Sequence, residues 1–410
     1  MAIIRHYVGK SDTLMQHQGE DHVTQREALR AIGQRIRSVR ERLHMTQEAV
    51  AERLGIPRSA VSEIETGKRE LSATELFTLS LLFGEPAEHL LGLVESASEE
   101  DLVMLRADAV TATDRVALNR FVHKCREYQE LEEITGERRE PDLRTSRTIL
   151  SAFEQAWRLA DEERKRLELG AAPAHQLIQV LEERVGIKVF FLELGDQISG
   201  ASIRSPRFGP ALLVNRGHVP GRRVFTAAHE FFHLLTEGRV ARSKGPEAIH
   251  VCTPNREGGR KDRADQLADQ FAGRLLLPPE HFLEQLRALE SKDGHVNPFD
   301  LNRVGQYFGV STQAVFVQMA AQRLIPWEKA KQIYGDAEFQ ERLVKDRGEE
   351  VGPEPRRFML LAVKAFLMHQ ISRARLAELL DINVAQVDGV IREVGGAGGM
   401  RDGIKLSLSR

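Results

Sequence analysis

The sequence has few of the features that mark membrane or secreted proteins. None of its apolar runs approaches the ~20 residues that a membrane-spanning helix needs, and 41% apolar with 29% charged residues is typical of globular proteins. It contains only two cysteines, Cys125 and Cys252, which lie far apart and outside any CxxC spacing. They support neither a disulfide framework nor a cysteine-based zinc site, so any metal must be bound by histidine and carboxylate groups.

The sequence also has little net charge and no pattern of a secretory signal. A formal net charge of −2 gives no indication of nucleic-acid binding for the chain as a whole, so local sequence has to decide. The first residues, MAIIRHYVGKSDTLMQ, place Arg5 inside the only apolar stretch and show no small-residue cleavage pattern. We therefore expect a cytoplasmic protein. A length of 410 residues predicts two to four domains.

Residues 31–66 carry the first strong pattern, apolar side chains at helical spacing that is interrupted near Met45 and at Gly55. The pattern predicts three short helices, of which the second and third form a helix-turn-helix. Thr46 is a suitable cap for the first helix of this motif, Ala51 is small where the helices cross, and Gly55 permits a left-handed turn. Five apolar side chains are placed to hold the two helices together: Val50, Leu54, Ile56, Val61 and Ile64.

This packing leaves one face of the second helix of the motif outward, where a recognition helix contacts base edges. The candidates for reading bases are Arg58, Ser59, Ser62 and Glu63. The candidates for phosphate contacts, which set register without reading sequence, are Gln47, Lys68 and Arg69. Ser72 and Glu75 have the spacing of a capping box and predict a further helix after the motif.

The stretch TQEAVAERLGIPRSAVSEIETGKRE resembles the XRE/Cro/C1 family of five-helix repressors. The resemblance covers about residues 28–94, within a domain predicted over residues 28–95. It implies a domain that binds double-stranded operator DNA, with homodimers on paired half-sites. An ordinary helical bundle with a glycine turn is the alternative. The coincidence of a small residue, a glycine and five apolar positions argues against it. Residues 1–27 are predicted to form a flexible arm before this domain.

Residues 96–147 are charged and are predicted to connect two domains. Their last part, GERREPDLRTS, has the composition of an exposed linker. Before it, the spacing predicts one long helix over Thr113–Gly136 with an apolar stripe. This stripe either pairs two protomers or docks on the neighbouring domain, and the sequence favours neither.

The next region, residues 148–325, has the pattern of an α+β unit. Helices are predicted over Ile149–Leu159 and Pro173–Val185, followed by the strands KVFFLEL and PALLVN, with ISGASIRS separating them. A further helix is predicted to begin near Pro220 and contains FTAAHEFFHLL.

His229 and His233 lie four residues apart on this last helix, so both side chains emerge from one face and can bind one metal ion. Glu230 lies beside them, where it can accept a proton from a water activated by zinc and pass it to a leaving amine. The arrangement fits peptide hydrolysis with one Zn²⁺ per chain. Mn²⁺ or another divalent ion is the alternative for these ligands.

A catalytic zinc site needs a third protein ligand. The stretch KDRADQLADQFAGRLLLPPE predicts an amphipathic helix that ends at Pro278 and Pro279, with Asp265 and Asp269 one turn apart on one face. We assign Asp265 as the third ligand, and Asp269 as the acceptor of a hydrogen bond from the outer nitrogen of a ligand histidine. The alternative is that both aspartates only solvate a surface helix. His250 is a further candidate, as a donor to the tetrahedral oxyanion.

Four stretches in this order, ISGASI, LLVNRG, RRVFTAAHEFFHLL and ADQFAGRLLLP, resemble the ImmA/IrrE family of metallopeptidases. The resemblance spans residues 148–325 and implies a gluzincin-like fold, in which a glutamate supplies the third ligand. Alignment on the shared Phe-Ala pair puts Asp265 in the place of that glutamate and Asp269 at the Asn/Asp position of the family. Because aspartate is one methylene shorter, the helix must lie closer, the metal must bind more weakly, or Asp262 must take over.

Two later segments repeat the helix-turn-helix spacing more weakly. Residues 301–318 have Gly309 at the turn, and residues 373–390 have Asp381 in place of the turn glycine. Because the helix after Gly309 is poor in basic residues, packing or partner contact is favoured over base reading. The first segment is assigned to the peptidase-like domain, and residues 326–410 are predicted to form a helical C-terminal region.

Together these patterns predict a mainly α, multidomain chain: a five-helix DNA-binding domain, an α+β gluzincin-like metallopeptidase domain with a small sheet, and a helical C-terminal region. The favoured function is a bacterial or phage-type transcriptional regulator whose zinc endopeptidase cleaves a helix-turn-helix repressor, or itself, in stress, mobile-element or defence control. For self-cleavage, the exposed linker Glu137–Ser146 is the expected target. The alternatives are a transcription factor with an inactive peptidase-fold sensing domain and a toxin-antitoxin fusion with a toxic peptidase.

Overall fold

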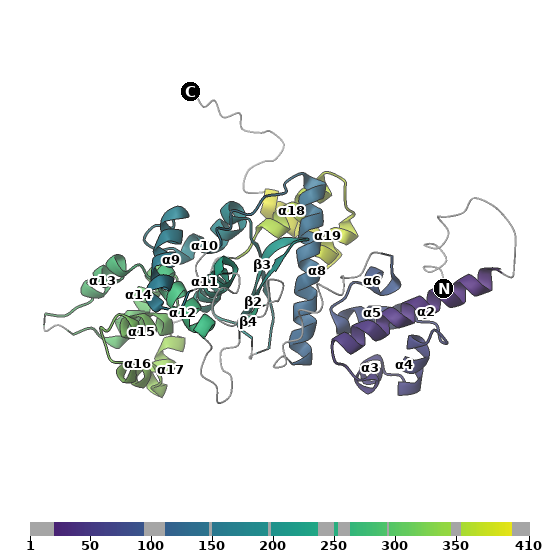
Figure 1. Cartoon of the computed structure of the whole chain (residues 1–410), viewed down its shortest axis with the longest axis horizontal. Helices are drawn as coiled ribbons and strands as arrows, with labels where there is room; N and C mark the ends of the chain where they lie inside the picture. The colour runs from purple at the N-terminus through teal and green to yellow at the C-terminus, as the bar shows by residue number, and fades with distance from the viewer. Residues whose placement is uncertain are drawn as a thin grey trace, which may run out of the picture. The chain divides into compact units, whose positions relative to one another are not determined.

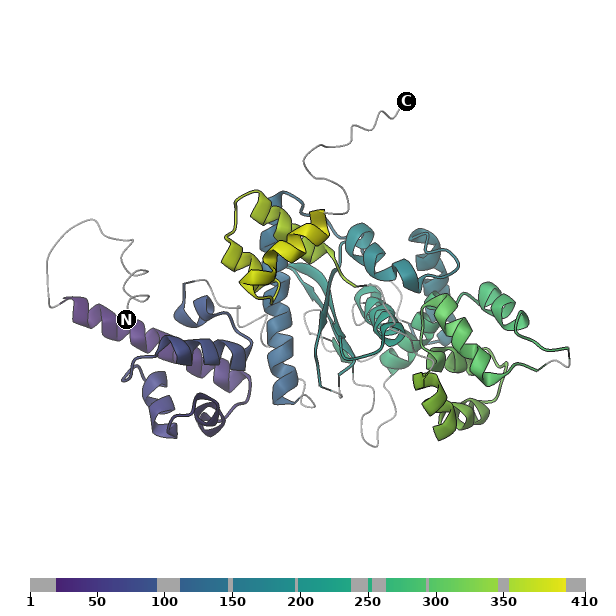
Figure 2. The ribbon, with the colours of Figure 1, turned by 180° about the vertical axis from the view of Figure 1, so that it is seen from behind.

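The computed structural model describes residues 20–93, 111–146, 150–195, 198–236, 250–252, 263–292, 295–345 and 354–395. The chain divides into two compact units, Met1–Ser98 and Glu99–Arg410, and each is described by itself (Figures 1 and 2). Among these residues, the structure contains no helix with the length and apolar character that crossing a membrane requires.

The first unit consists of helices, and its five helices within the described residues confirm the predicted five-helix architecture. They are α2 (Glu20–Arg42), α3 (Gln47–Leu54), α4 (Arg58–Glu65), α5 (Ala73–Phe83) and α6 (Ala87–Leu91). The side chain of Thr46 caps α3 by accepting a hydrogen bond from the Ala49 amide, and Gly55 ends α3 with a φ of 66°. Helix α2 begins inside the segment predicted as an arm, whose residues 1–19 lie outside the described part of the chain.

A buried ion pair holds α2 against the helix-turn-helix. The Arg40 guanidinium donates to both carboxylate oxygens of Glu65, at 2.6 and 3.1 Å, and Gln47 donates its amide to the same carboxylate at 2.8 Å. Such a two-pronged pair fixes orientation as well as distance, because the planar guanidinium and carboxylate must be coplanar. Glu65 therefore links α2, α3 and α4.

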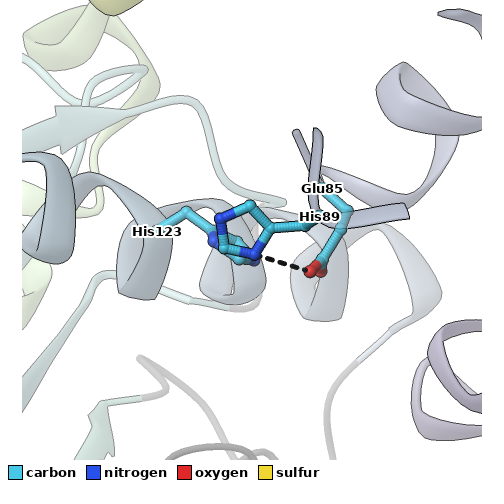
Figure 3. Close-up of side chains that lie close together, drawn as sticks. All are labelled: Glu85, His89 and His123. Atoms are coloured by element: carbon cyan, nitrogen blue, oxygen red, sulfur yellow. Dashed lines mark ion pairs between the residues drawn. The ribbon is translucent and has the colours of Figure 1, made fainter. Parts of the chain in front are cut away.

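A second buried carboxylate, Glu85, fixes the turn between α5 and α6. It accepts a hydrogen bond from Arg42 at 2.8 Å and lies 3.7 Å from the Nδ1 atom of His89 on α6, the pair joined by the dashed line in Figure 3. His123, also drawn there, belongs to the second unit. Glu85 thus joins the end of α2 to α6.

The second unit contains a four-stranded sheet among helices. The strands are β1 (Lys188–Leu192), β2 (Gly200–Ser205), β3 (Gly209–Asn215) and β4 (His250–Cys252). Their order is β1-β3-β2-β4, with β1 parallel to β3 and the other pairs antiparallel. The helices are α8 (Ala112–Thr135), α9 (Phe153–Arg166), α10 (Ala174–Val180), α11 (Pro220–Thr236), α12 (Arg263–Leu276), α13 (Pro279–Arg287), α14 (Leu301–Phe308), α15 (Thr312–Ala321), α16 (Trp327–Tyr334), α17 (Ala337–Lys345), α18 (Arg357–Leu367), α19 (Arg373–Leu379) and α20 (Val387–Gly395).

Strand β2 corrects the sequence analysis, which treated ISGASIRS as a separator between two strands. The segment lies inside the sheet, bonded to β3 on one side and β4 on the other. The small and polar residues of this segment did not indicate a strand, because strands are usually recognised by large β-branched or aromatic side chains. Here Ser202 is buried, and its hydroxyl group is satisfied by a carboxylate from α11.

Helices cover both faces of the sheet (Figure 1). On one face, Val189 and Leu212 share a core with Phe231 of α11 and Phe271 of α12. On the other face, the Phe190 ring packs edge-on against rings of α8 and α18. Successive residues of a strand point to opposite faces, so neighbours on β1 enter different cores.

The apolar stripe of α8 docks within the second unit, which answers the question that the sequence left open. Its buried members are Leu118, Phe121, Val122, Cys125, Tyr128 and Leu131. The stripe lies against β1 and α18, and only Ile134 near its end is exposed. Helix α8 is therefore an integral part of the second unit.

An ion cluster lies beneath this interface. The Glu132 carboxylate of α8 accepts from Arg357 of α18 at 2.5 Å and from Lys188 of β1 at 2.8 Å, and Arg357 also donates to the Tyr128 hydroxyl group at 3.2 Å. All three charged side chains are at most 6% exposed. The cluster joins a helix, a strand and a C-terminal helix.

Both later helix-turn-helix-like segments pack against other elements of the second unit. Val304 and Phe308 of the first belong to the main core of the second unit, with Gly309 at a φ of 69°. In the second, Asp381 adopts a φ of 55° without being glycine, and its carboxylate lies 3.1 Å from Lys124 of α8. This contact helps to hold a conformation that is unfavourable for residues other than glycine.

Candidate metal centre and DNA-binding face

The centre forms where α11 lies alongside α12. Helix α11 begins at Pro220, as predicted, and nearly all of its residues are buried between the sheet and α12. Helix α12 presents a buried face of Leu267, Ala268 and Phe271 to α11, and Pro279 begins the next helix. The apolar faces thus fix the distance between the two helices, and the polar residues of each meet at their edge.

Three predicted ligands converge at this edge. The Nε2 atoms of His229 and His233 lie 3.2 Å apart, and the Oδ1 atom of Asp265 lies 3.8 and 3.6 Å from them, respectively. Tetrahedral coordination with metal-ligand bonds of 2.0–2.1 Å separates ligand atoms by roughly 3.3–3.4 Å. The three residues therefore fit one divalent ion.

Asp265 reaches both histidines from α12, although its side chain is short. Asp265 is partly buried, with 17% of its side chain exposed, and reaches both histidines from a helix that packs tightly on α11. A partly buried carboxylate this close to both histidines argues against the alternative that Asp265 only solvates a surface helix. Asp262, the other candidate, lies outside the described residues.

Asp269 lies behind the site. Its Oδ1 atom is 3.0 Å from the Nδ1 atom of His229, so Nδ1 donates to this carboxylate and Nε2 faces the ligand position. Burial lowers the pKa of His229, but the carboxylates of Asp265 and Asp269 outweigh it and raise the pKa to about 10. A metal ion bound at Nε2 would take the place of the proton there.

Glu230 is fully buried next to the two histidines. Its Oε2 atom accepts a hydrogen bond from the Ser202 hydroxyl group of β2 at 2.8 Å. Gly200, two residues earlier, allows α11 to lie this close, since a Cβ atom there would be 2.6 Å from the Thr226 side chain. The sequence analysis missed both residues, although the quoted ISGASI stretch contains them.

His250 is the backbone partner of Ser202 on β4. Its side chain lies outside the described residues, so its predicted contact with the oxyanion stays a prediction.

On the first unit, the predicted DNA-reading residues lie at the start and outer face of α4. Arg58, Ser59 and Glu63 are exposed and Ser62 is half-buried; the Arg58 guanidinium lies 3.6 Å from the Glu48 carboxylate of α3. The amides of Arg58 and Ser59 also begin a helix, and helix N-termini attract phosphate oxygens.

The three predicted phosphate contacts differ in their surroundings. Lys68 is exposed, whereas Arg69 donates to Glu75 at 2.7 Å and Gln47 donates to buried Glu65. Lys68 is thus the most accessible of the three side chains. Gln47 contributes to the fold through its hydrogen bond to Glu65.

Comparison with known proteins supports this organisation. A family model described as Helix-turn-helix matches residues 36–90, and one described as IrrE N-terminal-like domain, a peptidase family, matches residues 182–319. No curated protein matches the chain. The crystal structure of ComR from Streptococcus suis aligns with 90% of this chain and 95% of that chain at 12% identity. Its TM-score of 0.15 is too low for any argument about fold.

The two matched regions follow each other in the order that the sequence predicts, and the second includes the two histidines, Glu230 and both aspartates. The chain therefore joins an XRE-type helix-turn-helix domain to a following domain of the IrrE/ImmA-like peptidase family.

Proposed function

We propose that this protein is a transcriptional regulator whose second domain is a metal-dependent endopeptidase, and that its substrate is a helix-turn-helix repressor. The observation that carries the proposal is the convergence of His229, His233 and Asp265 beside buried Glu230. Zinc is the proposed ion, because two imidazoles and one carboxylate with an open position are typical of catalytic zinc.

When bound, a divalent ion supplies Lewis-acid activation at the scissile carbonyl group and lowers the pKa of water. Glu230 accepts the proton of the attacking water and passes it to the leaving amine. Ser202 donates to Oε2 of Glu230 and so holds this carboxylate in one orientation. Asp269 keeps His229 in the tautomer that can bind a metal.

The linker Glu137–Ser146 is a poor target for self-cleavage. The Asp142 amide donates to the Val185 carbonyl group at 3.0 Å, and the Ser146 amide donates to the Leu235 carbonyl group at 2.8 Å. A peptidase must bind its substrate in an extended, accessible form, and proteolysis favours segments with few such bonds. These bonds favour cleavage of a separate protein over cleavage of this linker.

The proposal is tested with Glu230→Gln, which keeps the size of the side chain and removes the base. We expect cells that carry this variant to retain the target repressor under conditions where the parent chain removes it, with unchanged operator binding by the variant. Ser202→Ala should give partial loss through a lower kcat at unchanged KM, and Ser202→Thr should restore the rate. If Glu230→Gln removed the repressor as fast as the parent chain, the second domain would be a sensing module instead.

The first domain is proposed to bind its operator as a homodimer through α4. Arg58→Ala is expected to cost about 1–3 kcal/mol of binding at the cognate site and to relax the preference at one base pair. Lys68→Ala should weaken binding to all sequences alike and reduce the slope of log K against log salt by about 1. Fluorescence anisotropy with cognate and scrambled duplexes at several salt concentrations separates the two effects. Equal losses on both duplexes for Arg58→Ala would contradict base reading by this residue.

A further inference from the structure

A cavity of about 310 Å³ opens at the hairpin between β2 and β3, apart from the metal centre. Its walls come from α8, the linker after α8, the first residue of β1 and the hairpin itself. None of the metal ligands lines it. Its volume lies at the lower end of the range for small-molecule sites, about 300–1,000 Å³. This limits the occupant to a small molecule and argues against a nucleic-acid duplex or a folded protein.

The cavity is strongly basic in a chain with a net charge of −2. Four arginines line it, Arg138, Arg139, Arg204 and Arg207, against one acidic side chain at the rim, Glu140. The remaining charged lining residues, Lys188 and Glu132, belong to the buried ion cluster described above, together with Arg357. Four guanidinium groups around a small volume favour a phosphate group, whose oxygens accept paired hydrogen bonds from arginine.

Two of these arginines are held in place by the fold. Arg204 is half-buried and donates to the Thr145 hydroxyl group at 3.0 Å, and Arg139 donates to the Glu183 carbonyl group. Burial lowers the pKa of Arg204, because part of its charge is removed from water. An anion in the cavity would offset this cost. Arg138 and Arg207 are exposed at the mouth.

The cavity also has an apolar side. Pro141 and Pro206 are exposed and line it, and Pro210 and Phe208 complete that side. Proline rings offer flat apolar surface to a planar group, as ligand sites commonly do beside a few convergent polar groups. A phosphate pocket next to such a surface suits a molecule with both parts. We infer that this cavity binds a phosphorylated small molecule of mononucleotide size.

The position of the site connects it to the rest of the second unit. The linker that forms its wall continues through Thr145 to Ser146, whose amide bonds to the end of α11. Helix α11 carries His229 and His233. A ligand that fixes the linker would therefore stabilise a segment that is hydrogen-bonded to the metal-bearing helix.

The test is isothermal titration calorimetry of the full chain with adenosine 5′-monophosphate, adenosine and inorganic phosphate. We expect the mononucleotide to bind more tightly than either fragment. Arg138→Ser with Arg207→Ser should weaken it at least about tenfold, because two guanidinium groups that would donate to the phosphate are removed. Both side chains are exposed, so equal melting temperatures of parent and variant should confirm that folding is intact.

The matched control is Arg158→Ser with Lys165→Ser on α9. This pair removes the same charge from another hollow, where Glu154, Asp161 and Glu162 balance the cations, and should leave the affinity unchanged. Four results would overturn the inference: no binding of the mononucleotide at millimolar concentration, equal weakening by the control pair, adenosine or phosphate binding as tightly as the mononucleotide, or binding of an acidic peptide in its place. None of these readouts depends on peptidase activity, so they are separate from the failure of the proposed function.

Discussion

Replacement of His233 by alanine is expected to abolish tight binding of a divalent ion. The three ligand atoms lie 3.2 to 3.8 Å apart, and removal of one leaves only two protein ligands, too few for a zinc site. Asp265→Ala should have a comparable effect if the aspartate is the third ligand. Asp269→Ala should be milder, at about 10–100-fold in metal affinity, since Asp269 only orients His229.

This series is measured by metal analysis of the purified chains and by competition with a chromophoric chelator. His281→Ala is the control, because this histidine is exposed on α13 and should leave metal content unchanged. DNA binding reports on the first unit and should be the same for all four variants. Full metal occupancy in Asp265→Ala would show that another group supplies the third ligand and would return Asp262 to consideration.

Replacement of Glu132 by alanine is expected to destabilise the second unit by about 3–5 kcal/mol. The loss of this carboxylate removes the ion-pair partner that the two buried cations, Arg357 and Lys188, share. Among the described residues, the Arg357 guanidinium then keeps only neutral partners, the Tyr128 hydroxyl group and the Glu137 carbonyl group. Removal of one partner of a buried ion pair lowers stability much more than replacement of the whole pair by apolar residues. The remaining charge then stays desolvated without its partner. The effect should reach α8, β1 and α18 together.

Differential scanning calorimetry of the full chain checks this prediction, because the two compact units can give separate transitions. The transition of the second unit should shift to lower temperature, and that of the first unit should not move. Glu133→Ala is the matched control, since this neighbour is exposed and accepts a hydrogen bond from Gln129 of the same helix. A Glu132→Ala transition within 1 °C of the parent chain would mean that the cluster contributes little to stability.

Local patterns predicted the parts of the structure that depend on local chemistry. Thr46, Gly55 and the Ser72–Glu75 box act as caps and turns within a few residues of themselves, so spacing alone reveals them. The histidine pair is equally local, because four residues along a helix always bring side chains to one face. Asp265 lies on a second helix, so its place beside the histidines depends on how the two helices pack. Its spacing with Asp269 and the family resemblance both indicated it as the third ligand.

Contacts between distant elements could not be predicted in the same way. Ser202 looks like a loop residue until Glu230, on another element, satisfies its hydroxyl group. The stripe of α8 was visible as an apolar face, but its partner α18 lies far along the chain and has no pattern that points back to it. The arginines of the cavity come from the linker and the hairpin, and only the fold brings them together.

The pairing of α8 with α18 can form only late in the synthesis of the chain. Glu132 and Arg357 are 225 residues apart, so at about 5–20 residues per second the ribosome needs roughly 11–45 s to deliver the partner of α8. All five helices of the first unit emerge before that interval begins. A nascent chain can therefore complete its DNA-binding domain while the sheet that carries Ser202 still has one face exposed. Chaperone binding to stalled chains should concentrate between the emergence of β1 and that of α18.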